Sequence, residues 1–158
     1  DLGWRARIFG YRSYYVPQTI IHHHGSAHWK WSPQVFYLLE RNRWLVLLKN
    51  YSLITLLKLY PSLIIIELSM LGFFATKGLL LKKLKSYGSI LSLFGHIMKQ
   101  RKIIHNKRKI SDIEIIRSFC GTIKIPSEAN DSKLNNKFEK LLSSLCKFSG
   151  YDKIVREP

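Results

Sequence analysis

The side chains best suited to chemistry form a short run of histidines near the start of the chain. His22, His23 and His24 are consecutive, so in an extended strand His23 would lie on one face and its two neighbours on the other. A neutral imidazole at a strand end can coordinate Mn²⁺, or Mg²⁺ less readily, when carboxylates from elsewhere complete the site. The alternative is that all three histidines are ordinary surface or packing residues.

The residues around this triplet predict a helix followed by two short strands. A helix is expected over residues 2–9, because Asp1 is a good N-cap and Gly10 suits the turn that ends a helix. Residues 12–16 are rich in aromatic and β-branched side chains and predict a strand. A second short strand is expected over residues 19–23, which would carry the histidines at its end.

Residues 35–98 are mostly apolar with helical spacing and predict long helices, the first beginning near Pro33. The charged residues between positions 44 and 81 are Lys49, Lys58, Glu67 and Lys77. The most apolar part, residues 63–81, approaches the length of about 20 residues that a membrane span needs.

The charges in this segment bear on how it would meet a membrane. A charge at the centre of a bilayer costs about 2.5–3.5 kcal/mol. Glu67 and Lys77 therefore favour a pair of helices in the membrane interface over a helix that crosses it. Lys82, Lys83 and Lys85 follow, as basic residues do on the cytoplasmic side of membrane segments. The alternative is a helical hairpin buried in the core of a soluble protein.

The composition indicates an anionic partner. Lys and Arg number 26 against 10 Asp and Glu, a formal net charge of +16, while 46% of the residues are hydrophobic. Nucleic acid, an anionic membrane surface and a phosphorylated substrate would each fit. The basic residues 99–158 carry no helix-turn-helix, zinc-finger or aromatic-sheet signature, so we expect anionic lipid and no nucleic acid. The alternative is that these basic side chains form a solvated helix face.

An ordered series of residues runs through the first 50 positions. It comprises Asp1, Leu2, Trp4, Arg5, Gly10, Tyr11, Val16, Pro17 and His23, followed by the element Glu40-Arg41-Asn42-Arg43. The series resembles the part of family-two (GT-A type) glycosyltransferases that follows their catalytic acidic pair. In those enzymes a helix ends in Gly-Tyr, and a strand, a proline and a histidine come next. The chain is similar to the rhamnosyltransferase-like or polysaccharide-biosynthesis members of the family.

The resemblance implies a fold, which would be mostly α with a short β segment. The chain would be the C-terminal fragment of an α/β GT-A fold followed by amphipathic or membrane-associated helices. Residues 1–34 would end the catalytic domain, residues 35–98 would form apolar membrane-associated helices, and residues 99–158 a basic polar helical tail.

The implied activity is the transfer of a sugar, with inversion, from a nucleotide-sugar donor to a lipid-linked glycan or polysaccharide acceptor. The enzyme would work at the cytoplasmic face of the cell membrane, either attached to its surface or spanning it. It would carry a divalent metal, Mn²⁺ or Mg²⁺, that assists departure of the diphosphate.

The resemblance also implies roles for single residues. The general base of such enzymes would lie two positions before Asp1, so we expect the 158 residues alone to have no transfer activity. Asp1 would cap its helix, or help to orient the base or the acceptor. His23 corresponds to a histidine that completes the metal site. Trp4, Arg5 and His24 are expected to contact substrate.

The element Glu40-Arg41-Asn42-Arg43-Trp44 is similar to the Gln-x-x-Arg-Trp element of processive relatives. Glu in place of Gln argues against processive synthesis. Arg43 could bind the diphosphate of the donor or of a lipid, since a guanidinium matches phosphate oxygens bidentately, and Trp44 could stack on a sugar face. The alternative is that both side chains anchor a helix among lipid headgroups.

Two competing hypotheses remain. One is a non-enzymatic basic helical protein that binds anionic membrane surfaces or nucleic acid. The other is the inactive remnant of a transferase gene. The residues encoded just before Asp1 separate both hypotheses from a working transferase, because an acidic pair there, with an Asp-x-Asp further upstream, supports a working transferase.

Overall fold

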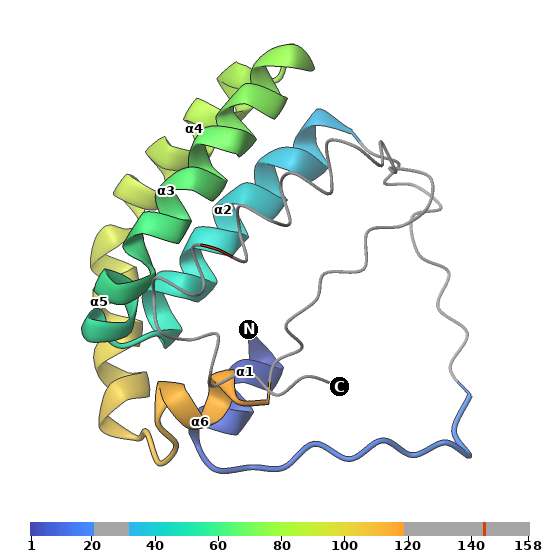
Figure 1. Cartoon of the computed structure of the whole chain (residues 1–158), viewed down its shortest axis with the longest axis vertical. Helices are drawn as coiled ribbons and strands as arrows, with labels where there is room; N and C mark the ends of the chain where they lie inside the picture. Colours follow the sequence, from blue (N-terminus) through green and yellow to red (C-terminus); the bar gives the residue numbers. More distant parts are fainter. Residues whose placement is uncertain (21–31, 119–143, 145–158) are drawn as a thin grey trace.

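The computed structural model describes residues 1–20, 32–118 and 144. Its main elements are α1 (Leu2–Ile8), α2 (Pro33–Asn50), α3 (Leu53–Thr76), α4 (Leu80–Ser92), α5 (Phe94–Asn106) and α6 (Asp112–Ile116). Helices α2, α3 and α4 lie side by side, and α1 and α6 lie together at one end of them (Figure 1). We call that end the base. The described residues are therefore all α, as the mostly α expectation requires.

Helix α1 ends as its sequence predicts. Gly10 follows the helix with φ +87°, a left-handed conformation that glycine adopts without strain. The amide of Gly10 donates to the carbonyl of Arg7 (2.9 Å) and the amide of Tyr11 to that of Ala6 (2.9 Å). This pair of bonds is a Schellman motif, which satisfies carbonyls that the helix itself leaves unpaired.

The strand predicted over residues 12–16 is wrong. These residues lie outside any helix or strand, and Tyr14 and Tyr15 are 78% and 88% exposed. No strand occurs in the described ranges, so this segment has no neighbour there to pair its backbone groups, and β propensity alone does not form a strand. The second predicted strand, 19–23, falls mainly outside the described residues.

Helices α2 and α3 begin at serines whose side chains cap them. Ser32 Oγ accepts from the amide of Val35 (3.4 Å), and Pro33 occupies the first helical position as predicted. Ser52 Oγ accepts from the amide of Thr55 (3.2 Å) at the start of α3. The sequence thus stops one helix and starts the next within three residues, which fixes the base of the bundle.

A tight turn joins α3 to α4. Gly78 has φ +67°, the amide of Gly78 donates to Ala75 (3.1 Å), and the amide of Leu79 donates to Phe74 (2.8 Å). This second Schellman motif reverses the chain, so α3 and α4 form a hairpin (Figure 1). The structure has a pair of helices here, and only 6% of the most apolar window of α3 is buried, so the described residues do not enclose this helix in a core.

Candidate functional site

Trp4 attaches α1 to the rest of the base. Its ring lies edge-on to Tyr51, with centroids 4.6 Å apart and planes at 82°. It packs against both small buried clusters of the base, one around Ile8 and Ile115 and one around Tyr51 and Ile116. Trp4 was expected to contact substrate, and the structure places it between α1, the α2–α3 turn and α6.

Asp1 occupies the N-cap position of α1, but its carboxylate does not cap the helix. It accepts from Lys49 Nζ (2.8 Å) and Asn50 Nδ2 (3.0 Å), and Arg5 Nε lies 3.5 Å away. Burial, and then the nearby charge of Arg5, lower the pKa of Lys49. Asp1 therefore ties α1 to the last turn of α2, and Arg5 is half-exposed beside it.

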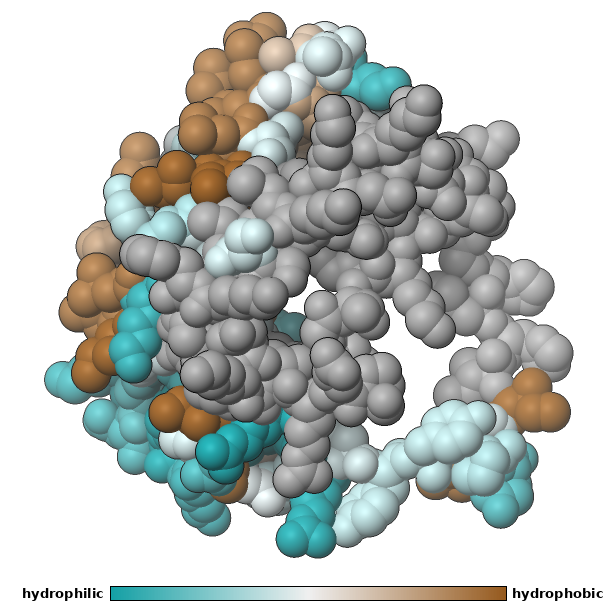
Figure 2. Space-filling model, in the orientation of Figure 1, coloured by the Kyte–Doolittle hydropathy of each residue, from teal (hydrophilic) through white to brown (hydrophobic). Residues whose placement is uncertain are grey.

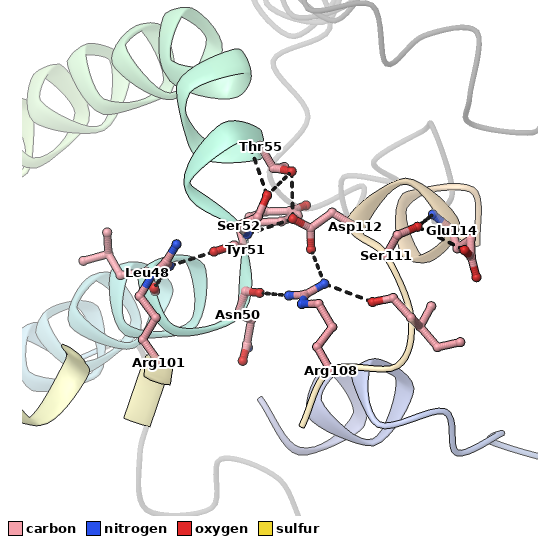
Figure 3. A network of polar contacts seen from close by, with 11 residues as sticks. Leu48, Asn50, Tyr51, Ser52, Thr55, Arg101, Arg108, Ser111, Asp112 and Glu114 are labelled. Carbon is pink, nitrogen blue, oxygen red and sulfur yellow. Dashed lines mark hydrogen bonds and ion pairs between the residues drawn. The ribbon is translucent and has the colours of Figure 1, made fainter. Parts of the chain in front are cut away.

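A polar network closes the base where α2 ends and α3 begins (Figure 3). The carboxylate of Asp112 accepts from the Ser52 amide, from Thr55 Oγ1 and from Arg108 Nη1, each at 2.7 Å. Arg108 also donates to the carbonyl of Asn50. The network places a negative charge at the N-terminus of α3 and a positive charge at the C-terminus of α2, which suits both helix dipoles.

The protonation states of Asp112 and His105, at the base of the bundle, follow from these contacts. Desolvation would raise the pKa of Asp112, but its bonds from Ser52 and Thr55 and the charge of Arg108 hold it below its ordinary value of 3.8. Burial, and then the positive charges of Arg101 and Arg108, lower the pKa of His105 from 6.5. Asp112 is therefore ionised and His105 neutral at physiological pH.

A second polar cluster lies between α2, α3 and α4. Arg43 Nη2 donates to Glu40 (2.8 Å) and to Glu67, and Lys83 Nζ pairs with Glu67 Oε1 (2.5 Å) and with Glu40. Tyr87 donates its hydroxyl to Glu67. We call these five residues the charge cluster. It has two positive and two negative side chains, so its net charge is zero.

Arg43 and Trp44, the predicted phosphate and sugar contacts, belong to this part of α2. The guanidinium of Arg43 faces Glu40 and Glu67, and its central carbon lies 5.5 Å from the ring of Trp44. Arg43 is six positions before Lys49, about 9 Å along the helix at 1.5 Å per residue. The structure therefore does not bring Arg43 and Trp44 together with Asp1, Trp4 and Arg5.

Trp44 also lines an apolar groove of about 240 Å³ between α2 and α3. The other lining residues are Leu48, Leu56, Leu57, Tyr60, Leu63, Ile64 and Glu67. The groove is almost entirely hydrocarbon, with Glu67 as its one charged residue, so it suits an aliphatic chain rather than a phosphate or a sugar.

A basic depression of about 660 Å³ lies over α5. Its described lining residues are Met98, Lys99, Arg101, Lys102 and His105. Arg101 is engaged by the carbonyl of Tyr51 (2.7 Å) and by that of Leu48. Lys99 and Lys102 are exposed, so the described lining of the depression carries positive charge at its surface.

The predicted metal ligand His23 and its neighbour His24 lie outside the described residues. Within the residues that are described, no three His, Cys, Asp or Glu side chains are grouped so that they could hold a metal ion. This part of the chain therefore does not supply a metal site by itself.

Sequence reasoning missed the residues that organise both polar sites. Lys83 was taken as a membrane flank, yet it is fully buried against Glu67. Opposite charges on either side of a glycine turn in an apolar segment are a signal for such a pair. Asp112 and Arg108 form an i, i+4 pair, but their bonds to Ser52 and Asn50 join residues nearly 60 positions apart and carry no local signal.

No protein-family model, no curated protein and no solved structure matches the chain. Any assignment of function therefore rests on the motif series and on the geometry of the two polar sites.

Proposed function

We propose that the chain is the C-terminal part of an inverting family-two glycosyltransferase at the cytoplasmic face of the cell membrane. The complete enzyme would move a sugar from a nucleotide-sugar donor to a lipid-linked glycan or polysaccharide acceptor. One observation carries the proposal. Helix α1, which holds the residues most like the family, contacts the end of α2 and Tyr51, two residues before the exposed apolar helix α3 begins.

The attachment would keep the catalytic region beside the membrane. Trp4 contacts Tyr51, and Asp1 bonds to Lys49 and Asn50, so α1 is held against the last turn of α2 and the residue that follows it, just before α3. An enzyme that extends a lipid-linked acceptor needs its chemistry close to the membrane segment that meets the lipid. A rigid joint at this turn meets that need, because it holds reacting groups in a fixed relation to the bilayer.

The general base follows from the family's spacing. It would lie two positions before Asp1, and two residues reach at most about 7 Å. That carboxylate would therefore sit close to the N-terminus of α1 and to the α2–α3 turn. There it would accept the proton of the acceptor hydroxyl as the oxygen attacks the anomeric carbon and the nucleoside diphosphate leaves. Asp1 itself is engaged by Lys49 and Asn50, so we assign it a positioning role.

The divalent metal belongs to the same proposal. His23 would offer one imidazole to Mn²⁺ or Mg²⁺, whose charge would stabilise the departing diphosphate. The described residues do not complete such a site. The remaining ligands must therefore come from other parts of the enzyme.

The experiment compares transfer by the full-length parent with transfer by two amide variants. Replacing the carboxylate two positions before Asp1 by its amide should lower the rate about 10²–10⁴-fold, the usual contribution of a general base. Asp1→Asn is the matched control, two positions away, and should lower the rate far less. Equal and small effects of the two changes would overturn the assignment of the base.

Two further measurements complete the test. His23→Ala in the parent should weaken the metal dependence of transfer, and unchanged metal dependence would reject the ligand role. The isolated 158 residues should not turn over nucleotide sugars, so measurable turnover would show that the catalytic parts have been misplaced.

A non-enzymatic membrane protein is the second candidate. It is favoured by the net charge of +16 together with the exposed apolar helix α3. A parent that lacks both an acidic pair before Asp1 and an earlier Asp-x-Asp would exclude the transferase and leave this function.

A further inference from the structure

The exposed side chains of α3 and α4 are mostly apolar, with Lys58 and Lys85 as the exposed charged residues of these two helices. Three of the apolar ones, Leu57, Tyr60 and Ile64, also line the apolar groove beside α2. We call this exposed apolar surface the outer face, and its residues are Leu53, Ile54, Leu57, Tyr60, Ile64 and Leu68 on α3 with Leu80, Leu81, Leu84 and Leu91 on α4. Figure 2 shows hydrophobic residues gathered along the α3–α4 edge and hydrophilic residues around the base. Soluble monomers rarely expose contiguous apolar patches beyond a few hundred Å², so the outer face requires an apolar partner.

The inward sides of the same helices are polar. Lys83 and Ser86 of α4 are fully buried, and Thr55 and Ser62 of α3 are almost fully buried. Among the described residues, Phe74 is the one large apolar side chain of the hairpin that is buried. Water favours the opposite arrangement, with apolar side chains inside. A hydrocarbon surrounding favours apolar side chains outside and polar side chains inside, because the enclosed polar groups can then pair with each other.

The charge cluster makes the enclosed charges compatible with hydrocarbon. Glu67 on α3 is paired with Lys83 on α4 and with Arg43 on α2, so no member faces the outer surface alone. The carboxylates and cations balance, and the paired cluster therefore avoids the cost of about 2.5–3.5 kcal/mol that insertion assigns to a lone charge. Tyr87 completes the cluster as a donor to Glu67.

The charges that remain exposed lie where headgroups can reach them. Lys58 is in the second turn of α3, Lys77 follows the last turn of α3, and Lys85 is in the second turn of α4, so each is near an end of its helix. Long lysine side chains can cover apolar surface while their ammonium groups reach the headgroup layer. Together with the basic α5, they suit an anionic membrane surface.

We propose that the α3–α4 hairpin lies within one leaflet of the bilayer with its outer face among the acyl chains, and that the neutral charge cluster permits this immersion. The inference deepens the membrane part of the proposed function and rests on it. It does not require sugar transfer, so the two can fail separately.

The first experiment asks whether the outer face touches lipid. The full chain, with Cys120 and Cys146 changed to Ser, would carry a fluorescent label at Leu57→Cys or Leu84→Cys and be bound to liposomes containing spin-labelled acyl chains. Both outer-face labels should be quenched by the lipid. A label at Lys109→Cys, exposed at the base, is the matched control and should not be.

The possible outcomes separate the occupants of the outer face. Quenching at both outer-face positions supports immersion in one leaflet. The proposal would be overturned if the fluorescent labels were quenched strongly only by lipid spin labels at the bilayer centre or in the far leaflet. That result would favour a helix that crosses the membrane. A shielded label without lipid quenching, together with cross-links between chains, would show that a second copy covers the face and would also overturn the proposal.

The second experiment tests the charge cluster by flotation with zwitterionic liposomes at high salt, where surface attraction is screened. Lys83→Met leaves the cluster with one uncompensated negative charge and should reduce retention at least about tenfold. Lys83→Met with Glu67→Gln restores neutrality and should recover most of the retention. The double variant guards against simple misfolding, and equal losses in both variants would reject the role of charge balance.

Discussion

The base and the hairpin are built on opposite plans. At the base, Ile8, Ile104 and Ile115 are buried together and the polar network lies around helix ends. In the hairpin, Lys83 is fully buried while Leu84, the next residue in the chain, is 51% exposed. The base therefore has apolar side chains inside, whereas the hairpin has charged side chains inside and apolar side chains outside.

The difference shows that helical pattern alone does not define the core of this chain. Helix α4 has a clear apolar side, and a rule for soluble proteins would turn that side inward. The charge cluster instead holds the polar side of α4 against α2, through Lys83 and Glu40. The two regions are connected at the turn formed by Tyr51 and Ser52. Trp4 of α1 contacts Tyr51, and Asp112 of α6 accepts a hydrogen bond from the amide of Ser52.

The largest expected effect is from Asp112→Ala, which would destabilise the base of the bundle and leave the contacts of the charge cluster unchanged. The substitution leaves Arg108 without its carboxylate and removes the acceptor of Ser52 and Thr55. Breaking a buried pair from one side costs about 3–5 kcal/mol. Thermal unfolding in a mild detergent measures the loss. Glu114→Gln on the same helix is the control and should stay within about 0.5 kcal/mol, so a similar loss in both variants would contradict the assigned network.

The next effect compares one apolar residue from each region. Ile115 is 1% exposed at the base and Leu84 is 51% exposed in the hairpin. Ile115→Ala should cost about 2–5 kcal/mol of unfolding free energy in detergent, since it leaves a cavity. Leu84→Ala should cost less than about 0.5 kcal/mol by the same measurement, yet weaken liposome retention. Equal destabilisation by both changes would show that the hairpin has an ordinary apolar core.

Local signals in the sequence predicted much of the fold. Pro33 after a serine, and Gly10 after the first helix, mark boundaries through backbone conformations that few other residues adopt. The strand predicted over residues 12–16 is wrong because strand formation depends on a partner, which β propensity does not report.

The candidate site was less predictable from sequence. Asp1 was expected to cap α1, but Lys49 and Asn50 at the end of α2 compete for its carboxylate. Arg43 was expected to face phosphate, yet Glu67 lies 24 positions later in the chain and pairs with it. Contacts of this kind depend on how helices pack, and residue spacing within one helix cannot reveal them.

The smallest expected effect is a loss of base stability in acid, in two steps. The folded pKa of His105 lies below 6.5 because of burial and the charges of Arg101 and Arg108. The unfolded chain therefore binds more protons as pH falls below about 6.5, which lowers stability. The folded pKa of Asp112 lies below 3.8, so its contribution is present above about pH 4 and is lost as pH falls through the folded pKa.

Hydrogen exchange of the α6 amides, corrected for the intrinsic rates, would follow both steps from neutral pH downward. His105→Gln should remove the first step and leave the second, because the bonds to Asp112 come from Ser52, Thr55 and Arg108 rather than from His105. A first step that persists in His105→Gln would assign it to another group. In that case the neutral histidine would not contribute to the acid sensitivity of the base.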